Sequence, residues 1–161
     1  MKLEKTYTVN APIEKVLEGI RDPAMIEANE KSRDALEVKI EDVQRDDSKH
    51  CYRVATTNHF RTKTGGEDKS KTELNTITNE WDLNTKSCTW SWEGNNPNTA
   101  KVKLSGTTAL KASGDKTEMT QSVDAEINIP LIGKTISKKV AAEFEKEWPK
   151  YVTQLEKFLG S

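Results

Sequence analysis

The sequence lacks long apolar runs, and no stretch approaches the ~20 consecutive apolar residues that a membrane-spanning helix needs. Its first residues, MKLEKTYTVNAP, also lack the apolar centre of a secretion signal. The chain also has no large excess of positive or negative charge, because 25 basic residues are interspersed with 26 acidic ones. A partner held by charge alone is therefore disfavoured. We expect a cytoplasmic protein with no nucleic-acid partner and no integral membrane contact.

Cysteine and histidine are scarce, with two of each. Cys51 and Cys88 lack the C-x-x-C spacing of metal and redox sites, so free thiols are expected. The spacing of His50 and His59 does not supply the ligands of a zinc site. A nucleophile elbow, a phosphate loop and a dinucleotide fingerprint are also absent from the sequence. We expect no metal, no cofactor and no recognisable catalytic constellation.

What the sequence does contain is enough material for one domain. A chain of 161 residues can bury a real core, although only 34% of its residues are hydrophobic. Those apolar residues recur at regular intervals, which argues against disorder. We therefore expect residues 1–161 to form a single domain.

The first third of the chain predicts a strand and two short helices. Residues 2–10 alternate in the manner of a strand, with Lys5 as the exception on its apolar face. Asn10 and Pro12 then resemble a helix start, with Asn10 as the N-cap. Asp22 and Pro23 end that helix and precede a second short one.

From residue 35 the apolar residues follow a period of two for almost a hundred residues, which predicts about six strands. Residues 61–72, RTKTGGEDKSKT, are expected to form an exposed loop between two of them. Around the turn LNTKS, Trp81 is expected to face Trp90, with Asn79 opposite Trp92 and Leu83 opposite Cys88.

A second predicted hairpin turns at ASGDKT and gives a self-consistent register. The expected cross-strand pairs are Leu110 with Met119, Thr108 with Gln121, Gly106 with Val123, Leu104 with Ala125, and Val102 with Ile127.

The last part of the chain, INIPLIGKTISKKVAAEFEKEW and onward, concentrates apolar residues around a strand end and a long helix. Pro130 ends the strand, and Gly133 lets the chain turn. A stripe at helical spacing then runs over more than six turns, and Pro149 is expected to kink the helix or to mark a boundary in it. The stripe consists of Ile136, Val140, Phe144, Trp148, Tyr151, Val152, Leu155 and Leu159.

The order of elements predicts an α+β fold. A curved antiparallel sheet of about seven strands must cover its apolar face, and the long C-terminal helix is the element large enough to do so. In this order, and in the stretches YTVNAPIEKVLEGIRDP, TNEWDLNTKSCTWSW and INIPLIGKTISKKVAAEFEKEWPKYVTQLEKFL, the chain resembles the START-like, or SRPBCC, superfamily with its helix-grip fold. The last stretch is similar to an uncharacterised bacterial branch of that superfamily.

The superfamily includes polyketide cyclases, plant pathogenesis-related ligand binders and lipid-transfer domains. The resemblance implies an apolar cavity between the sheet and the long helix. The residues expected to line it, from the predicted faces, are Tyr52, Val54, Ile77, Trp81, Trp90, Trp92, Leu104, Thr108, Gln121, Val123, Ile136, Val140 and Phe144.

Several of these side chains have two interpretations. The tryptophans either fill the core or stack on a ringed ligand. Thr108 and Gln121 either bond to each other or anchor a ligand. His59 is either an exposed residue at a loop edge or a general base at the cavity mouth.

The lysines at 134, 138 and 139 lie near the start of the predicted long helix, where the helix dipole disfavours positive charge. They are either simply solvated or face an anionic group at the cavity mouth.

Three functions follow from these patterns. The first is the binding or carriage of a small hydrophobic ligand, lipid-like or aromatic, between the sheet and the C-terminal helix. The second is an enzyme of the cyclase or dehydratase type that uses the same cavity, with His59, Gln121 or Tyr52 moving a proton. The third is a cochaperone-like interaction module, which an exposed apolar patch would favour.

Overall fold

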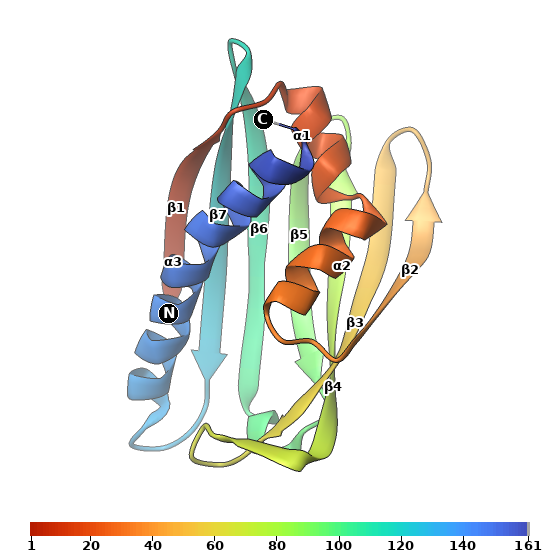
Figure 1. The fold of residues 1–161 in the computed structure, drawn as a ribbon. Coiled ribbons are helices and arrows are strands. Elements are labelled where there is room, and N and C mark those ends of the chain that lie inside the picture. The colour runs from red at the N-terminus through yellow and green to blue at the C-terminus, as the bar shows by residue number, and fades with distance from the viewer. Residues whose placement is uncertain (161) are drawn as a thin grey trace.

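A computed structural model describes residues 1–160 of the chain (Figure 1). Strand β1 is followed by two short helices, six further strands with one 3-10 turn, and a long C-terminal helix. The elements are β1 (Lys2–Val9), α1 (Ile13–Ile20), α2 (Pro23–Ser32), β2 (Glu37–Arg45), β3 (Lys49–Arg61), β4 (Glu67–Asp82), β5 (Ser87–Gly94), η1 (Pro97–Thr99), β6 (Val102–Ser113), β7 (Lys116–Ile127) and α3 (Gly133–Phe158).

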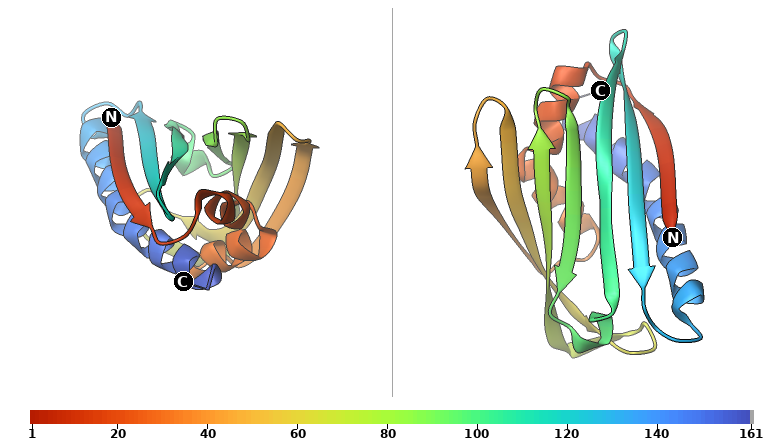
Figure 2. Two further views of the ribbon diagram at one scale, coloured as in Figure 1. Left: turned by 90° about the horizontal axis from the view of Figure 1, so that it is seen from above. Right: turned by 180° about the vertical axis from the view of Figure 1, so that it is seen from behind.

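The seven strands form one antiparallel sheet in the order β1-β7-β6-β5-β4-β3-β2. The sheet is curved, with α3 running along its β1 edge and α2 beside β2, so the helices lie on the concave side (Figure 2). The predicted α+β architecture, a curved antiparallel sheet closed by the C-terminal helix, is confirmed.

The starts of the two short helices follow different rules. Asp22 caps α2 as its sequence suggests, accepting a hydrogen bond of 2.9 Å from the Ala24 backbone N–H. The predicted N-cap Asn10 is wrong, because α1 begins only at Ile13, after an extended Pro12. A residue that precedes proline favours the extended conformation, which delays the first helical turn until Pro12 has been passed.

The predicted exposed loop at 61–72 is also wrong in extent. β3 continues to Arg61 and β4 begins at Glu67, so only a short turn separates them. Thr62 N–H closes this turn on the Gly66 carbonyl at 2.9 Å. The residues of this end are mostly polar on both faces, so no apolar alternation marked them as strands.

One hairpin has the predicted register and the other does not. All five predicted pairs between β6 and β7 are confirmed. Between β4 and β5, Trp81 faces Cys88 rather than Trp90, because the last pair is Asp82 with Ser87 and the turn is centred one residue earlier than expected. The Asp82 carboxylate accepts hydrogen bonds from the backbone of Asn84 and Thr85, and Lys86 adopts a φ of 57°. A displacement of two residues keeps every side chain on its predicted face.

The long helix runs without interruption through Pro149, so no boundary occurs there. Pro149 is exposed, whereas Trp148 and Val152 are buried. Burial of apolar residues on both sides of the proline compensates for the one backbone hydrogen bond that it removes.

The core occupies one end of the concave face. It joins α1, α2 and the C-terminal part of α3 to the ends of the strands nearest them. Its buried members are Val9, Ala11, Val16, Leu17, Ile20, Met25, Tyr52, Val54, Trp81, Cys88, Leu110, Met119, Val152 and Leu155.

Candidate functional site

The predicted cavity residues of the sheet all lie on its concave face, in three rows that cross the strands. The pairing of neighbouring strands places these rows side by side. The Trp81 row is His50, Trp81, Cys88, Thr108 and Gln121; the Trp90 row is Tyr52, Asn79, Trp90, Gly106 and Val123; the Trp92 row is Val54, Ile77, Trp92, Leu104 and Ala125.

The end of this face near the Trp81 row is filled by protein. Trp81 Nε1 donates a hydrogen bond of 3.3 Å to the Tyr52 hydroxyl, and both side chains belong to the core. Burial raises the pKa of Tyr52, and it raises the pKa of the neighbouring Cys88 thiol to about 12. Tyr52, Val54 and Trp81 therefore take part in core packing.

Thr108 and Gln121 bond to each other, which was the simpler of their two interpretations. The Thr108 hydroxyl donates to Gln121 Oε1 at 2.6 Å, and both residues are buried. Gln121 Nε2 in turn lies 3.7 Å from Met119 Sδ. Because each polar group has a partner within the protein, the pair is compatible with an apolar interior.

The opposite end of the concave face is covered less completely, and we call it the open half. It consists of the half-buried Ile77, Trp90, Trp92 and Leu104 of the sheet together with the half-buried Ile136, Val140 and Phe144 of α3. The helices make their extensive contacts with β1, β2, β6 and β7 rather than with β4 and β5. Large apolar side chains in the middle of the sheet are thus left with accessible surface.

Aromatic rings connect the open half to the helix. Trp90 of β5 and Phe144 of α3 stack with centroids 6.0 Å apart. Phe144 also contacts Trp148 at 5.7 Å, and Trp148 contacts Tyr7 of β1 edge-on at 6.4 Å. This series of four rings spans the concave face from β1 to β5, at separations typical of favourable aromatic pairs.

Glycines make room for the two tryptophans of the open half. A Cβ atom on Gly106, the cross-strand partner of Trp90, would lie 2.6 Å from Trp90 Cζ2. A Cβ atom on Gly94 would lie 2.8 Å from Trp92 Cζ2. Each indole ring therefore lies close against glycine backbone, which is possible only without a side chain there.

The position of α3 follows from small residues on the side that faces the sheet. Gly133, Ser137 and Ala141 are buried at one-turn intervals, and α3 packs against β7 and β1. A Cβ atom on Gly133 would lie 2.5 Å from the Ile127 carbonyl oxygen, so the helix start approaches the end of β7 very closely. Lys5, the polar exception on the β1 face, pairs with Glu145 of α3 at 3.0 Å.

A polar edge borders the open half on β3 and β4. Asn58 Oδ1 accepts hydrogen bonds from Thr56 Oγ1 at 2.9 Å and from Asn75 Nδ2 at 3.2 Å. The buried Oδ1 of Asn75 has no hydrogen-bond partner within residues 1–160. The site therefore combines an apolar surface with one polar side.

His50 comes directly after the turn between β2 and β3, yet it is only 2% exposed. Arg21 Nη1 donates to His50 Nδ1 at 2.9 Å, and His50 Nε2 lies 2.7 Å from Asp42 Oδ1. Because arginine is a donor only, the imidazole carries its proton on Nε2 and donates it to Asp42. This hydrogen bond is the main cause that lowers the pKa of Asp42. Sequence reasoning missed the network because its residues come from three separate elements.

His59 lies at the bulge between β3 and β4 and is half-buried. Its Nδ1 atom is buried and has no hydrogen-bond partner within residues 1–160.

Glu30 is the acidic side chain that the sequence did not mark. It lies on the face of α2 that carries Met25 and Ile26 of the core, and it is half-buried. Burial raises the pKa of its carboxyl, which the charge of Arg33 offsets only in part. Burial, followed by the charges of Tyr52, Cys88 and Glu30, raises the pKa of Tyr151 on α3. A desolvated carboxyl thus faces the interior of the helix and sheet layers.

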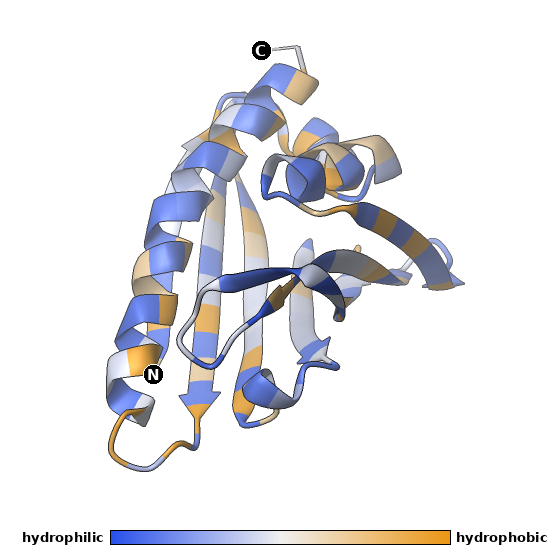
Figure 3. Ribbon diagram, turned by 60° about the horizontal axis from the view of Figure 1, so that its bottom comes forward, coloured by the Kyte–Doolittle hydropathy of each residue, from blue (hydrophilic) through white to orange (hydrophobic). Residues whose placement is uncertain are grey.

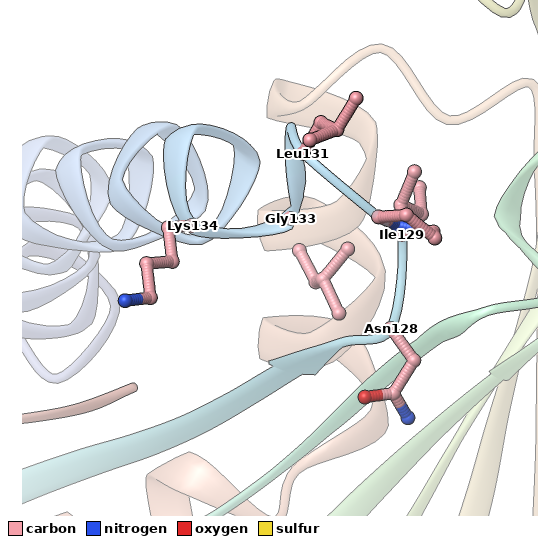
Figure 4. Close-up of a pocket in the computed structure, with 7 residues that line it drawn as sticks. Asn128, Ile129, Leu131, Gly133 and Lys134 are labelled. Atoms are coloured by element: carbon pink, nitrogen blue, oxygen red, sulfur yellow. The ribbon is translucent and has the colours of Figure 1, made fainter.

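A separate hollow of about 530 Å³ lies at the junction of β7 and α3. It is lined by Ile127, Asn128, Ile129, Pro130, Leu131, Gly133 and Lys134. Figure 4 shows the Leu131 and Lys134 side chains pointing away from one another at the start of the helix. In Figure 3 the loop that joins β7 to α3, at one end of the molecule, is coloured mainly as hydrophobic.

The structure also bears on metals and membranes. Within residues 1–160, His, Cys, Asp and Glu side chains nowhere gather in a group of three or more that could hold a metal ion. In the same part of the chain, no helix is both long enough and apolar enough to cross a membrane.

Comparison with solved structures identifies the fold. The protein TTHA0849 from Thermus thermophilus superposes with a TM-score of 0.64 at 18% identity, covering 99% of this chain and 97% of that one. The Zhui aromatase/cyclase from Streptomyces sp. R1128 gives 0.63 at 13% identity, with 99% and 93% covered. A START superfamily protein from Mycobacterium smegmatis gives 0.60 at 16% identity, with 99% and 97% covered.

These similarities confirm a START-like, polyketide cyclase-like helix-grip fold. Residues 4–159 match the family described as "Protein of unknown function (DUF2505)", and the chain belongs to that family. No curated protein matches the sequence.

Proposed function

We propose that the protein binds or carries a small hydrophobic ligand, lipid-like or aromatic, between the open half of the sheet and α3. The observation that carries this proposal is the incomplete burial of Ile77, Trp90, Trp92 and Leu104 in the middle of the concave face. A single domain of this size normally covers its largest apolar side chains, and an apolar surface in a concave site is the usual setting of a ligand. The similarity of the fold to an aromatase/cyclase and to a START superfamily protein supports the same class of ligand.

Fluorescence titration with N-phenyl-1-naphthylamine tests the proposal, because the probe brightens in an apolar site. Leu104→Asn in the open half is expected to weaken probe binding about fivefold to tenfold, by removing part of the apolar contact. The control is Leu74→Asn, since Leu74 is 44% exposed and alternates with Ile77 of the open half, so it lies on the other face of β4 and its replacement should leave the affinity unchanged. Absence of probe binding, together with no compound released from the purified protein in native mass spectrometry, would contradict the proposal.

A second candidate, an enzyme of the cyclase or dehydratase type, is supported by Glu30. A carboxylate deprived of water is a stronger base, and its raised pKa is closer to neutrality. In this reading Glu30 accepts a proton from a ligand held beside α2. It replaces Gln121 and Tyr52 as the candidate for proton transfer, because those two side chains are bonded to Thr108 and Trp81.

The base elimination of 5-nitrobenzisoxazole provides a test that needs no natural substrate. A desolvated carboxylate takes the proton from carbon 3 while the N–O bond breaks, which releases a coloured cyanophenolate. The rate should fall to the background level in Glu30→Gln and stay unchanged in Glu27→Gln, whose side chain is exposed on the same helix. Equal rates in the two variants would rule out Glu30 as an accessible base.

A further inference from the structure

The β7–α3 junction projects apolar side chains into solvent. Leu131 is 102% exposed and Ile132 is 52% exposed, next to an exposed Pro130 and a half-buried Ile129. Leu131 adopts a φ of 72°, a left-handed conformation that disfavours leucine. Folding does not bury this apolar side chain, and its backbone conformation is unfavourable, so Leu131 does not stabilise the fold. An exposed apolar side chain held in this way is better explained by a binding role. We call residues 129–132 the apolar tip.

Positive charge follows the apolar tip at the start of α3. Residues 127–142 contain three lysines, at 134, 138 and 139, and no acidic residue. All three lysines are exposed, and within residues 1–160 none of them forms a salt bridge. They lie in the first turns of α3, where the helix dipole makes a cation unfavourable rather than helpful. The chain as a whole is almost neutral, so this local excess is a property of the tip.

From these observations we propose that the apolar tip docks the protein on an anionic lipid surface, with Leu131 and Ile132 entering the interface and the lysines contacting lipid phosphates. An apolar tip with a basic border is the composition that such surfaces bind. A protein partner fits less well, because stable protein interfaces need about 800 Å² on each side, whereas this tip is a narrow projection of four residues. The flexible lysine stems allow ammonium groups on different sides of the helix start to reach the same plane.

The proposal goes beyond ligand binding and does not depend on it. The tip and the open half are nevertheless connected through α3, whose first two turns carry the lysines together with Ile136 and whose next turns carry Val140 and Phe144. Docking at the tip would therefore place the open half next to a source of lipid-like molecules.

Sedimentation of the full chain with vesicles tests the proposal, with no small ligand in the assay. Vesicles of equimolar phosphatidylcholine and phosphatidylglycerol are expected to bind the protein, and vesicles of phosphatidylcholine alone are expected to bind it far less. Leu131→Asn combined with Ile132→Asn should reduce binding at least tenfold, since the apolar contribution is lost. Asparagine tolerates a positive φ, so the variant keeps the backbone of the tip.

A second variant changes only the charge. Replacing Lys134, Lys138 and Lys139 by glutamine should weaken binding about a hundredfold, because each lysine near an anionic surface contributes roughly a factor of five. The matched control replaces Lys15, Lys111 and Lys116, which are exposed near α1 and the β6–β7 turn at the opposite end (Figure 1) and should not matter.

Three outcomes would overturn the proposal. One is an absence of binding to either kind of vesicle. Another is equal loss of binding in the tip variants and in the control. The third is self-association of the wild type that disappears in the Leu131→Asn and Ile132→Asn variant, which would assign the tip to a second copy of the chain.

Discussion

Trp90 of β5 and Phe144 of α3 lie with ring centroids 6.0 Å apart and an angle of 29° between their planes. This contact joins the middle of the sheet to the long helix, where most other contacts of the helix are with β1 and β7. Both rings belong to the open half, and the Trp90 row lies beside the Trp81 row of the filled end. The stack therefore controls both the position of the helix and the accessible surface of Trp90.

Phe144→Ala is expected to lower the free energy of unfolding by about 1–2 kcal/mol, since a half-buried ring contributes less than a fully buried one. Trp90 should become more exposed, so the tryptophan emission should shift to longer wavelength. Urea unfolding and fluorescence spectra measure the two effects. Phe158→Ala on the same helix is the control, because Phe158 is 42% exposed and its loss should change neither quantity. Equal effects of the two substitutions would disprove the role of the stack.

Gly106→Ala is expected to destabilise the protein by about 1–3 kcal/mol, the usual cost of overpacking. The new methyl group would overlap the Ser122 carbonyl oxygen and lie 2.6 Å from Trp90 Cζ2. Thermal unfolding measures the change. Gly66→Ala offers a comparison, because its nearest neighbour would be 3.5 Å away and its φ is not left-handed. A Gly106→Ala protein as stable as wild type would show that the Trp90 ring can leave its position freely.

Asp42→Ala is expected to cost about 1–3 kcal/mol, because it leaves the buried Nε2–H of His50 without an acceptor. Asp42→Asn should cost less, since the amide oxygen can still accept this hydrogen bond. The difference between the two variants, measured by urea unfolding, isolates the hydrogen bond from the loss of side-chain volume. If both variants unfold at the same urea concentration as the wild type, the network does not stabilise the fold.

Glu30→Gln is expected to stabilise the protein at neutral pH. Burial in the folded state raises the pKa of Glu30 above its unfolded value of about 4.3. Between these two pKa values, the folded state therefore binds more protons than the unfolded state does. The destabilising effect of the carboxylate is therefore absent below this window and grows as the pH rises through it. Urea unfolding across this pH range measures the effect.

The control for Glu30 is Glu27→Gln, which should leave the pH dependence of stability unchanged because Glu27 is exposed. A Glu30→Gln protein whose stability follows that of wild type at every pH would show that the carboxyl remains solvated.

The order of elements and the register of one hairpin could be predicted, because alternation fixes which face of a strand is buried. The β6–β7 hairpin illustrates this, since its four apolar or small pairs and the polar pair of Thr108 with Gln121 admit one register. The turn of the β4–β5 hairpin is centred one residue earlier than predicted, where the Asp82 side chain accepts two backbone hydrogen bonds, an interaction that hydrophobic alternation does not report. The polar ends of β3 and β4 were missed because strands exposed on both faces carry no apolar period.

The candidate site was predictable only in part. The sequence places the thirteen candidate residues on the inner face of the sheet or on the apolar stripe of α3. It does not show how deeply each side chain is buried. Tyr52 and Trp81 lie in the core because α1 and α2 cover their end of the sheet, a fact of three-dimensional packing. His50 and Glu30 were missed because their burial depends on residues that are distant in sequence. For His50 this residue is its hydrogen-bond partner Arg21, and for Glu30 it is its neighbour Tyr151. Contact of the remaining residues with a ligand stays a prediction.

The pairing of β1 with β7 has a consequence for folding. Val9 pairs with Thr117 and Lys2 with Asp124, so the first strand finds its partner only after more than a hundred intervening residues. Closing so long a loop costs entropy that local contacts do not repay, and topologies of this kind fold slowly. On a ribosome, β1 would remain unpaired until β7 emerged, while the hairpins from β2 to β7 could form in the order of synthesis. We expect the β1 edge, and the end of α3 that packs on it, to be the last part of the sheet to assemble.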